Sequence, residues 1–327
     1  MDRMLIFGGT GSLGKTLIAH FIGNYEVYVF SRDEAKHVAI KQMYPAVKSL
    51  IGDIRDRDAV VAAMLRVKPQ IVINAAALKN VPEVEEVPME GIKTSLIGTE
   101  NVTVAARMMV GMNSTGLRPT LPIKILTVST DKACHPVNSY GMAKALQERL
   151  HIRSNGDGLV CNAVRYGNVL ESRGSLIPLI KEKFKNDESV CITHPDMTRF
   201  FLTLDSSVEL IKTALDDNEG GKTFIPQIRS ARIADVVDVF RRHYGRDDSK
   251  VTVGSIRPGE KIDEVLISRE ELLRTEKQCQ VYVVHDILTT EQFANDLHEE
   301  LSSGSVHTLL FSKALIGFLT NAGLLND

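Results

Sequence analysis

Three adjacent side chains, Thr130, Asp131 and Lys132, bring a hydroxyl, a carboxylate and an ammonium together. They follow an apolar run at residues 123–128, which predicts a buried strand. In open α/β sheets, ligands bind beyond the carboxyl ends of the strands. An acid and a base at such a position can move protons on a bound substrate. We therefore take this segment as the candidate catalytic centre.

Tyr140 and Lys144 follow shortly after, within a helical pattern at residues 140–151. Their i,i+4 spacing places the phenol and the ammonium on one helix face. A nearby cation stabilises a phenolate, so we expect Tyr140 to act as a base nearer neutral pH than a free tyrosine. The pair indicates hydride chemistry.

A glycine loop near the N-terminus predicts a dinucleotide site. A strand expected at residues 4–8 leads into Gly8-Gly-Thr-Gly11-Ser-Leu-Gly14, and a helix is expected from residue 15. Gly8 permits the tight turn, Gly11 lets the backbone approach a pyrophosphate, and Gly14 allows close helix packing. The helix N-terminus favours phosphate. The residues expected to contact the cofactor are Gly8, Thr10, Gly11, Ser12, Leu13, Gly14, Ser31, Arg32, Asp53, Ile54, Ala75, Ala76, Ala77, Tyr140 and Lys144.

The end of the second expected strand, residues 26–30, bears on the choice of cofactor. An acidic residue there would bind the ribose 2′-hydroxyl of NAD, whereas Ser31 and Arg32 suit a 2′-phosphate and favour NADP. Asp33 lies close enough to keep NAD possible. Asp53, after a third strand at residues 48–51, is placed to meet an adenine edge.

Alternating strands and helices predict an α/β fold, a doubly wound parallel sheet of Rossmann type. We expect residues 1–165 to form the NADP-binding domain, with part of 200–226 returning to it, and residues 166–327 to form mainly a smaller α/β substrate-binding region. A long helix is expected at 91–109, a connector at 111–122, and a helical tail at 289–301 and 309–319.

The composition excludes several classes of protein. A net charge of -2 over 327 residues gives no reason to expect nucleic acid or a membrane surface. No apolar stretch reaches the length of a membrane span, and no signal peptide is apparent. The four cysteines form no C-x-x-C pair, so reduced thiols in a cytoplasmic compartment are expected, with no metal site.

Basic residues recur in expected loops of the second half of the chain: Arg165, Arg173, Arg199 and Arg257. Guanidinium groups bind phosphates well, so this recurrence predicts a second phosphorylated ligand. Lys79 and the acidic stretch at residues 83–86 lie in an expected loop. This loop is either a charged surface or part of a substrate site.

With these motifs, the chain resembles an extended short-chain dehydrogenase/reductase. Segments 75–82, 129–144, 165–178, 197–200 and 257–261 are similar to the soluble, C5-inverting UDP-N-acetylglucosamine 4,6-dehydratases of bacterial surface-sugar pathways. The resemblance extends to about residue 267 and implies a UDP-sugar substrate, a tightly bound and recycled NADP, and a homo-oligomer, either dimer or hexamer. It places substrate-binding residues at Lys79, Asn168, Arg173, Ser175, Arg199, Arg257 and Glu260.

The resemblance also implies a mechanism. Tyr140, assisted by Lys144 and Thr130, takes the proton of the sugar 4-hydroxyl while hydride leaves C4. Lys132 removes the C5 proton and Asp131 assists loss of the 6-hydroxyl as water, after which hydride returns to C6. An acid and a base with separated pKa values suit this elimination.

Two residues depart from the family pattern. Many relatives that retain the C5 configuration have methionine where this chain has Tyr140, so the tyrosine favours inversion and the L-arabino-hexos-4-ulose product. Ser95 stands where relatives usually have asparagine. A retaining dehydratase, a nucleotide-sugar 4-epimerase and a catalytically silent NADP-binding protein remain the alternatives, and the Asp131-Lys132 pair separates the dehydratases from the epimerase.

Overall fold

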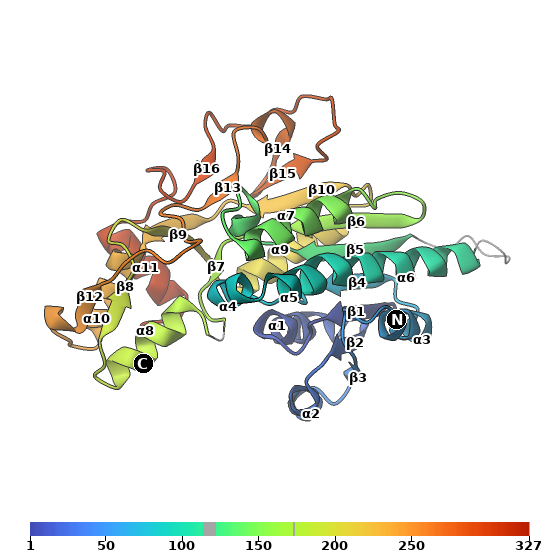
Figure 1. Cartoon of the computed structure of the whole chain (residues 1–327), viewed down its shortest axis with the longest axis horizontal. Helices are drawn as coiled ribbons and strands as arrows, with labels where there is room; N and C mark the ends of the chain where they lie inside the picture. Colours follow the sequence, from blue (N-terminus) through green and yellow to red (C-terminus); the bar gives the residue numbers. More distant parts are fainter. Residues whose placement is uncertain (114–121, 173, 327) are drawn as a thin grey trace.

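A nine-stranded sheet organises the computed structural model, which describes residues 1–113, 122–172 and 174–326. The strands lie in the order β3-β2-β1-β4-β5-β6-β10-β15-β14, and all pairs from β3 to β10 are parallel (Figure 1). The parallel strands are β1 (Arg3–Phe7), β2 (Glu26–Ser31), β3 (Lys48–Ile51), β4 (Ile71–Asn74), β5 (Ile123–Val128), β6 (Leu159–Val164) and β10 (Lys222–Pro226). The expected α/β fold with a Rossmann-like sheet is therefore confirmed.

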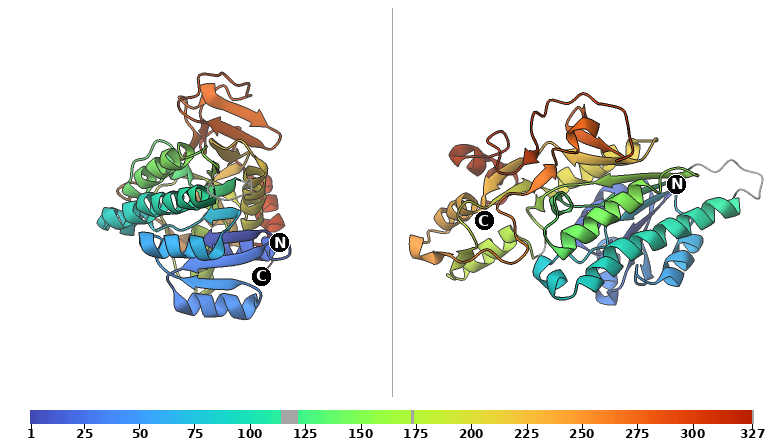
Figure 2. Two further views of the ribbon diagram at one scale, coloured as in Figure 1. Left: turned by 90° about the vertical axis from the view of Figure 1, so that its right-hand side faces the viewer. Right: turned by 45° about the horizontal axis from the view of Figure 1, so that its top comes forward.

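The central strands are continuous apolar runs because helices cover both faces of the sheet. Every residue of β4 and of β6 is buried. Helix α1 (Ser12–Phe21) packs beside α9 (Leu204–Asp216) on one face. Helix α3 (Arg57–Val67) packs beside α6 (Gly98–Asn113) on the other, and α7 (Ser139–Ile152) packs beside α6 (Figure 2). Two cores result, one on each face.

The single long helix expected at residues 91–109 is divided. Helix α5 (Pro88–Ile92) leads into a π-helical turn at Lys93–Ile97, and α6 continues from there. The residues expected as a loop at 83–86 belong to a short helix, α4 (Val81–Glu86). The expected connector begins inside α6 and otherwise lies mostly outside the described residues. Helix α2 (Glu34–Met43) completes the N-terminal half.

A third core lies at the left of Figure 1, away from β1 to β3. It is built from α8 (Leu176–Lys185), β8 (Val190–Ile192), α10 (Ile233–His243), β12 (Val251–Val253) and α11 (Ser312–Asn321). Between this core and the large sheet stands a three-stranded sheet of β7 (Asn168–Val169), β9 (Thr198–Leu202) and β11 (Arg229–Arg232). The strands β13 (Val265–Ile267) and β16 (Leu301–Ser302) pair separately.

The C-terminal tail differs from the sequence prediction. Residues 289–301 form no helix, and two strands before them, β14 (Thr275–Gln278) and β15 (Val281–His285), extend the large sheet in antiparallel fashion. The tail's backbone instead bonds along β14, with Lys277 N–H donating to Ala294 C=O. The Asn295 amide also donates to the carbonyls of Leu272 and Thr275. These partners replace helical i→i−4 bonds.

The proposed division at residue 165 stays a prediction.

Within the described ranges, no helix has the length and apolar character needed to cross a membrane.

Candidate active site

A cavity of about 1430 Å³ opens beyond the carboxyl ends of the parallel strands. One side is formed by the β1–α1 loop, the ends of β2, β4 and β5, and the start of α7. The other side is formed by residues around β7, α8, β8 and β9, together with the loop at residues 257–260. The cavity has room for a dinucleotide and a second ligand, and it lies where open α/β sheets bind ligands.

The glycine loop forms a cradle that side chains would fill. Gly8 has a φ of +75°, and a Cβ on it would lie 2.8 Å from the carbonyl oxygen of Ala75. A Cβ on Gly14 would lie 2.3 Å from the Gly9 carbonyl oxygen. The α1 N-cap is Gly11, which provides no side-chain acceptor for the first-turn N–H groups. The cradle thus fits a pyrophosphate held by backbone N–H groups. All predicted cofactor residues, Gly8, Thr10, Gly11, Ser12, Leu13, Gly14, Ser31, Arg32, Asp53, Ile54, Ala75, Ala76, Ala77, Tyr140 and Lys144, line the cavity.

At the end of β2, two cations face the cavity. Arg32 is half exposed, and its Nη1 lies 3.7 Å from Asp53 Oδ2. Asp33 is occupied as the N-cap of α2: it accepts from the Lys36 N–H at 3.0 Å and pairs with Lys36 Nζ at 2.7 Å. Ser31 is hydrogen-bonded to Thr10 at 3.0 Å. Lys36, which the sequence did not indicate, also lines this rim, where its charge is balanced by Asp33.

Asp53 lines the cavity as expected, but its carboxylate already has a strong partner. Arg55 Nη2 lies 2.6 Å from Asp53 Oδ2, and Arg55 Nε lies 2.9 Å from the same oxygen. Arg55 also pairs with Glu90. The contact of Asp53 with an adenine edge stays a prediction.

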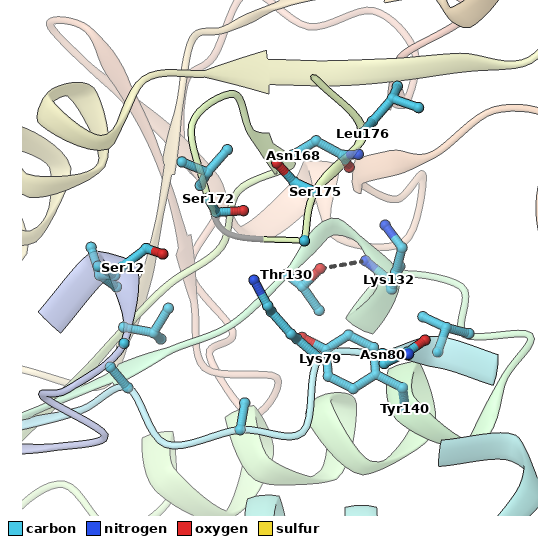
Figure 3. A pocket seen from close by; sticks show the side chains of 18 of the residues that line it. Ser12, Lys79, Asn80, Thr130, Lys132, Tyr140, Asn168, Ser172, Ser175 and Leu176 are labelled. Carbon is cyan, nitrogen blue, oxygen red and sulfur yellow. Dashed lines mark hydrogen bonds between the residues drawn. The ribbon is translucent and has the colours of Figure 1, made fainter. Parts of the chain in front are cut away.

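The predicted catalytic segment is held together by two caps and one glycine. Thr130 caps a 3-10 turn at Asp131–Ala133, and its Oγ1 donates to Asp131 Oδ1 at 2.9 Å. Asn138 caps α7 by accepting from the Gly141 N–H at 2.7 Å. A Cβ on Gly141 would lie 2.3 Å from the Lys132 carbonyl oxygen, so only glycine lets α7 approach the turn this closely. Figure 3 shows the result, with Tyr140, Thr130 and Lys132 all on the wall of the cavity.

Burial governs the two groups on α7. The Lys144 ammonium donates to the Val128 carbonyl oxygen at 2.8 Å, and burial lowers its pKa to about 8. Burial also raises the pKa of Tyr140 to about 12, although the charge of Lys132 and a hydrogen bond with Thr130 oppose the rise. Burial thus opposes the expected shift of the Tyr140 pKa towards neutral pH, because desolvation outweighs the charge of Lys132.

Asp131 and Lys132 form a contact pair at the cavity wall. Lys132 Nζ lies 3.0 Å from Asp131 Oδ1 and 3.3 Å from Glu264 Oε1. Lys132 lines the cavity, whereas Asp131 is fully buried behind it and is not among the described lining residues. Burial raises the pKa of Asp131 against the pull of Lys132. Burial would lower the pKa of Lys132, but the two carboxylates hold it above its ordinary value.

The predicted substrate residues converge on the same cavity. Lys79, Asn168, Ser175, Arg199, Arg257 and Glu260 all line it, while Arg173 lies outside the described residues. Arg199 is buried and its Nη1 donates to the carbonyl oxygens of Thr198 at 2.6 Å and Ile262 at 3.0 Å. Arg257 is exposed, with its Nη1 3.8 Å from Glu260 Oε1.

Arg165 is not a ligand-binding residue of this cavity, contrary to the expectation from its loop position. Its guanidinium is buried between two carboxylates, with Nη2 2.6 Å from Glu148 Oε2 and Nη1 2.8 Å from Glu271 Oε2. The guanidinium is therefore paired on both sides with carboxylates of the protein itself. Through these pairs Arg165 joins α7 to the segment before β14.

Ser95 lies in the π-helical turn, buried and without a hydrogen-bond partner for its hydroxyl among the described residues. Such turns are frequent at functional sites. No group of three or more His, Cys, Asp or Glu side chains in the described ranges is arranged to hold a metal ion.

Comparison with known proteins assigns the family. Residues 4–286 match the family described as polysaccharide biosynthesis protein. The chain belongs to this family. A UDP-glucose 4-epimerase of Rickettsia felis is 36% identical over 286 residues, covering 84% of this chain and 80% of the relative. An uncharacterised membrane protein of Methanocaldococcus jannaschii is 36% identical over 297 residues, covering 86% of this chain and 85% of the relative.

Solved structures agree on the fold. The X-ray structure of Pen from Bacillus thuringiensis has a TM-score of 0.88 and 28% identity, and covers 99% of this chain and 98% of that one. A dTDP-glucose 4,6-dehydratase of Streptomyces venezuelae, DesIV with NAD and TYD bound, has a TM-score of 0.67 at 18% identity, covering 80% of this chain and 86% of that one. The chain thus has the fold of the extended short-chain dehydrogenase/reductases.

Proposed function

We propose that this protein is a nucleotide-sugar 4,6-dehydratase that converts UDP-N-acetylglucosamine to a UDP-2-acetamido-2,6-dideoxy-hexos-4-ulose with inversion at C5. The contact of 3.0 Å between Lys132 and Asp131, directly beside Thr130 and the Tyr140 helix, carries this proposal. An enzyme that only oxidises and reduces C4 needs the tyrosine and Lys144, and has no use for an added acid and base.

NADP is the proposed cofactor. Arg32 on the rim supports a 2′-phosphate, and Asp33 is occupied by its capping bond and by its ion pair with Lys36. When bound, NADP would take hydride from C4 of the sugar and later return it to C6. The glycine cradle supports the placement of its pyrophosphate at the start of α1.

Tyr140, Thr130 and Lys144 would handle the proton of the sugar 4-hydroxyl. Tyr140 is the proposed proton acceptor, with Thr130 as its hydrogen-bond partner. Because the pKa of Lys144 is lowered to about 8, its ammonium can lose or regain a proton near neutral pH. In its neutral form Lys144 would take the phenol proton of Tyr140; as the ammonium anchored to Val128 it would then offset the charge of the phenolate that accepts the 4-hydroxyl proton.

Asp131 and Lys132 would eliminate water in the next step. Transfer of one proton from Lys132 to Asp131 across their 3.0 Å contact gives a neutral amine and a carboxylic acid together. The amine then faces the cavity as the base for the C5 proton. Asp131, buried behind Lys132, is the proton source for the departing 6-hydroxyl and would deliver that proton through Lys132. The raised pKa of Asp131 favours this transfer and the raised pKa of Lys132 opposes it, so the neutral pair would be a minor form of the protein.

The second ligand would lie against the far side of the cavity. Arg199 and Arg257 are the proposed cations for the diphosphate, with Lys79, Asn168, Ser175 and Glu260 beside it. Arg173 is proposed for the same group on resemblance alone. A homo-oligomer, either dimer or hexamer, and a cytoplasmic location stay predictions.

The test is the product formed from UDP-N-acetylglucosamine in deuterated water. Mass spectrometry should show loss of one water, and proton NMR should show deuterium at C5 in the L-arabino configuration. Lys132→Ala should lose the elimination while its NADP affinity matches that of the parent enzyme; its Tm should fall, because Asp131 and Glu264 lose a buried counter-ion.

The relatives named UDP-glucose 4-epimerase favour a second candidate, a nucleotide-sugar 4-epimerase. An epimerised product of unchanged mass would replace the dehydratase proposal with this one. Formation of the D-xylo product would support a dehydratase that retains the configuration at C5 instead of inverting it.

A further inference from the structure

Glu264 is a buried carboxylate that stands against the proposed catalytic lysine. It precedes β13 and is 2% exposed, and its Oε1 lies 3.3 Å from Lys132 Nζ. Its backbone is fixed from both sides by one residue: the Glu264 N–H donates to Ser303 Oγ at 2.8 Å, and its carbonyl accepts from the Ser303 N–H at 2.8 Å. The direction of the carboxylate is therefore set by the C-terminal part of the chain.

Two further cations surround this carboxylate. Lys261 Nζ lies 2.8 Å from Glu264 Oε2, and Arg199 Nε lies 4.0 Å from Oε1. Lys261 is itself held in place, because its ammonium donates to the carbonyl oxygens of Cys134 at 3.0 Å and His135 at 3.3 Å. Burial raises the pKa of Glu264, but Lys132, Lys261 and Arg199 together bring it below the ordinary value, so Glu264 stays ionised.

We propose that Glu264 is a positioning residue for water elimination, which anchors Lys132 opposite Asp131 and has Lys261 as its own counter-ion. This inference rests on the proposed dehydratase function and deepens it. The two carboxylates that flank Lys132 have different environments: Asp131 faces one cation and Glu264 faces three. The repulsion between them favours a proton on Asp131, and Glu264 remains the anion.

The charged groups that face this site are Asp131 and Lys132 on the 3-10 turn, Arg199 on β9, and Lys261 on the segment that carries Glu264. Removal of a buried anion lowers the pKa of every neighbouring group, and removal of a cation raises it. The two macroscopic pKa values of the Asp131–Lys132 pair should therefore move together. If Glu264 had a purely structural role, these two pKa values would not move, so a shift of the pH profile tests the proposal.

The experiment compares Glu264→Gln with Lys261→Met in the cofactor-loaded enzyme. For each variant, the rate of water loss from UDP-N-acetylglucosamine is followed across pH. In Glu264→Gln, both limbs of the profile should move to lower pH by about one pH unit, and elimination at neutral pH should fall about tenfold or more. In Lys261→Met, both limbs should move to higher pH. The exposed control Glu270→Gln should keep the parent profile, since its side chain is 77% exposed.

Oxidation at C4, read from nicotinamide absorbance in a single turnover, serves as the internal standard. It should persist in Glu264→Gln, because Tyr140, Thr130 and Lys144 are intact. An unchanged profile, equal shifts in both variants, or loss of C4 oxidation in a folded Glu264→Gln would each overturn the inference. If Glu264→Gln does not fold, Lys261→Met decides: a shift to higher pH supports the inference, and any other result refutes it. Absence of water loss in the parent enzyme would instead refute the proposed function.

Discussion

Replacing Arg165 with methionine should destabilise the fold by about 3–5 kcal/mol, the usual cost of leaving a buried charge without its partner. Arg165 makes four contacts with two carboxylates: Nε at 3.1 Å and Nη2 at 2.6 Å to Glu148, and Nη1 at 2.8 Å and Nη2 at 3.0 Å to Glu271. Methionine would leave both carboxylates buried without this cation. For a chain of this length, the loss corresponds to a fall in Tm of about 4–7 °C.

The pKa of Glu271 gives an independent measure of the same network. Burial raises this pKa, but the Arg165 guanidinium outweighs burial and holds it at about 2, compared with an ordinary value of 4.5. That difference corresponds to about 3 kcal/mol. Because the folded-state pKa is the lower one, the stabilisation is present above about pH 4.5 and is lost as pH falls towards 2. The difference in the free energy of unfolding between the parent protein and Arg165→Met should therefore become smaller as the pH falls over this range.

Urea denaturation followed by circular dichroism, at pH 7 and at pH 4, measures both effects. Steady-state kinetics with the UDP-sugar supplies the second readout, and Arg257→Met is the matched control. The Arg257 side chain is 60% exposed, and its pair with Glu260 spans 3.8 Å, so its loss should cost less than about 0.5 kcal/mol of stability and raise KM. An unchanged denaturation midpoint with a raised KM in Arg165→Met would refute the reasoning and restore a ligand role for Arg165.

Three further predictions concern the cavity. Tyr140→Phe should reduce turnover by about 10²- to 10⁴-fold while NADP binding, followed by fluorescence titration, stays within twofold; a variant that turns over normally would exclude Tyr140 as the proton acceptor. Arg32→Ser should weaken NADP binding by about tenfold or more and leave NAD binding unchanged in calorimetry, whereas equal losses for both cofactors would contradict a 2′-phosphate contact. Gly14→Ala should abolish NADP binding because its Cβ would lie 2.3 Å from the Gly9 carbonyl oxygen; in Gly23→Ala, where a Cβ meets nothing within 4 Å, binding should persist, and tight binding in both would argue against the cradle.

The parallel core of the fold was predictable because burial on both faces leaves a continuous apolar run in the sequence. Strands β4 and β6 are such runs, and the expected bounds of the neighbouring β5, residues 123–128, match the observed ones. Strand β14 has no such signal. It lies at the edge of the sheet, and three of its four residues, Glu276, Lys277 and Gln278, are polar and at least partly exposed. Its pairing depends on β15, which the helical expectation for the tail did not include.

In the candidate site, too, the contacts between residues close in sequence were predictable, and those between distant residues were not. Thr130 to Lys144 span one turn and one helix, so the positions of their side chains follow from local rules, including the Asn138 cap. Arg165 and Arg199 look alike in the sequence, since each lies near the end of a strand. Arg165 has carboxylate partners 17 and 106 residues away, at 2.6 and 2.8 Å, whereas Arg199 lies 4.0 Å from the Glu264 carboxylate and lines the cavity.

A charge near a strand end therefore predicts a ligand only when the folded chain leaves it on the cavity wall, and close carboxylates from distant parts of the sequence keep Arg165 away from that wall. Glu264 illustrates the opposite case, because nothing in its local sequence points to chemistry. The pairing of residues 264 and 303 brings its carboxylate to within 3.3 Å of Lys132. If the charge of Glu264 sets the protonation of the Asp131–Lys132 pair, then the segment after residue 260 contributes to catalysis as well as to substrate binding. The opposite pH shifts expected for Glu264→Gln and Lys261→Met would demonstrate this contribution directly.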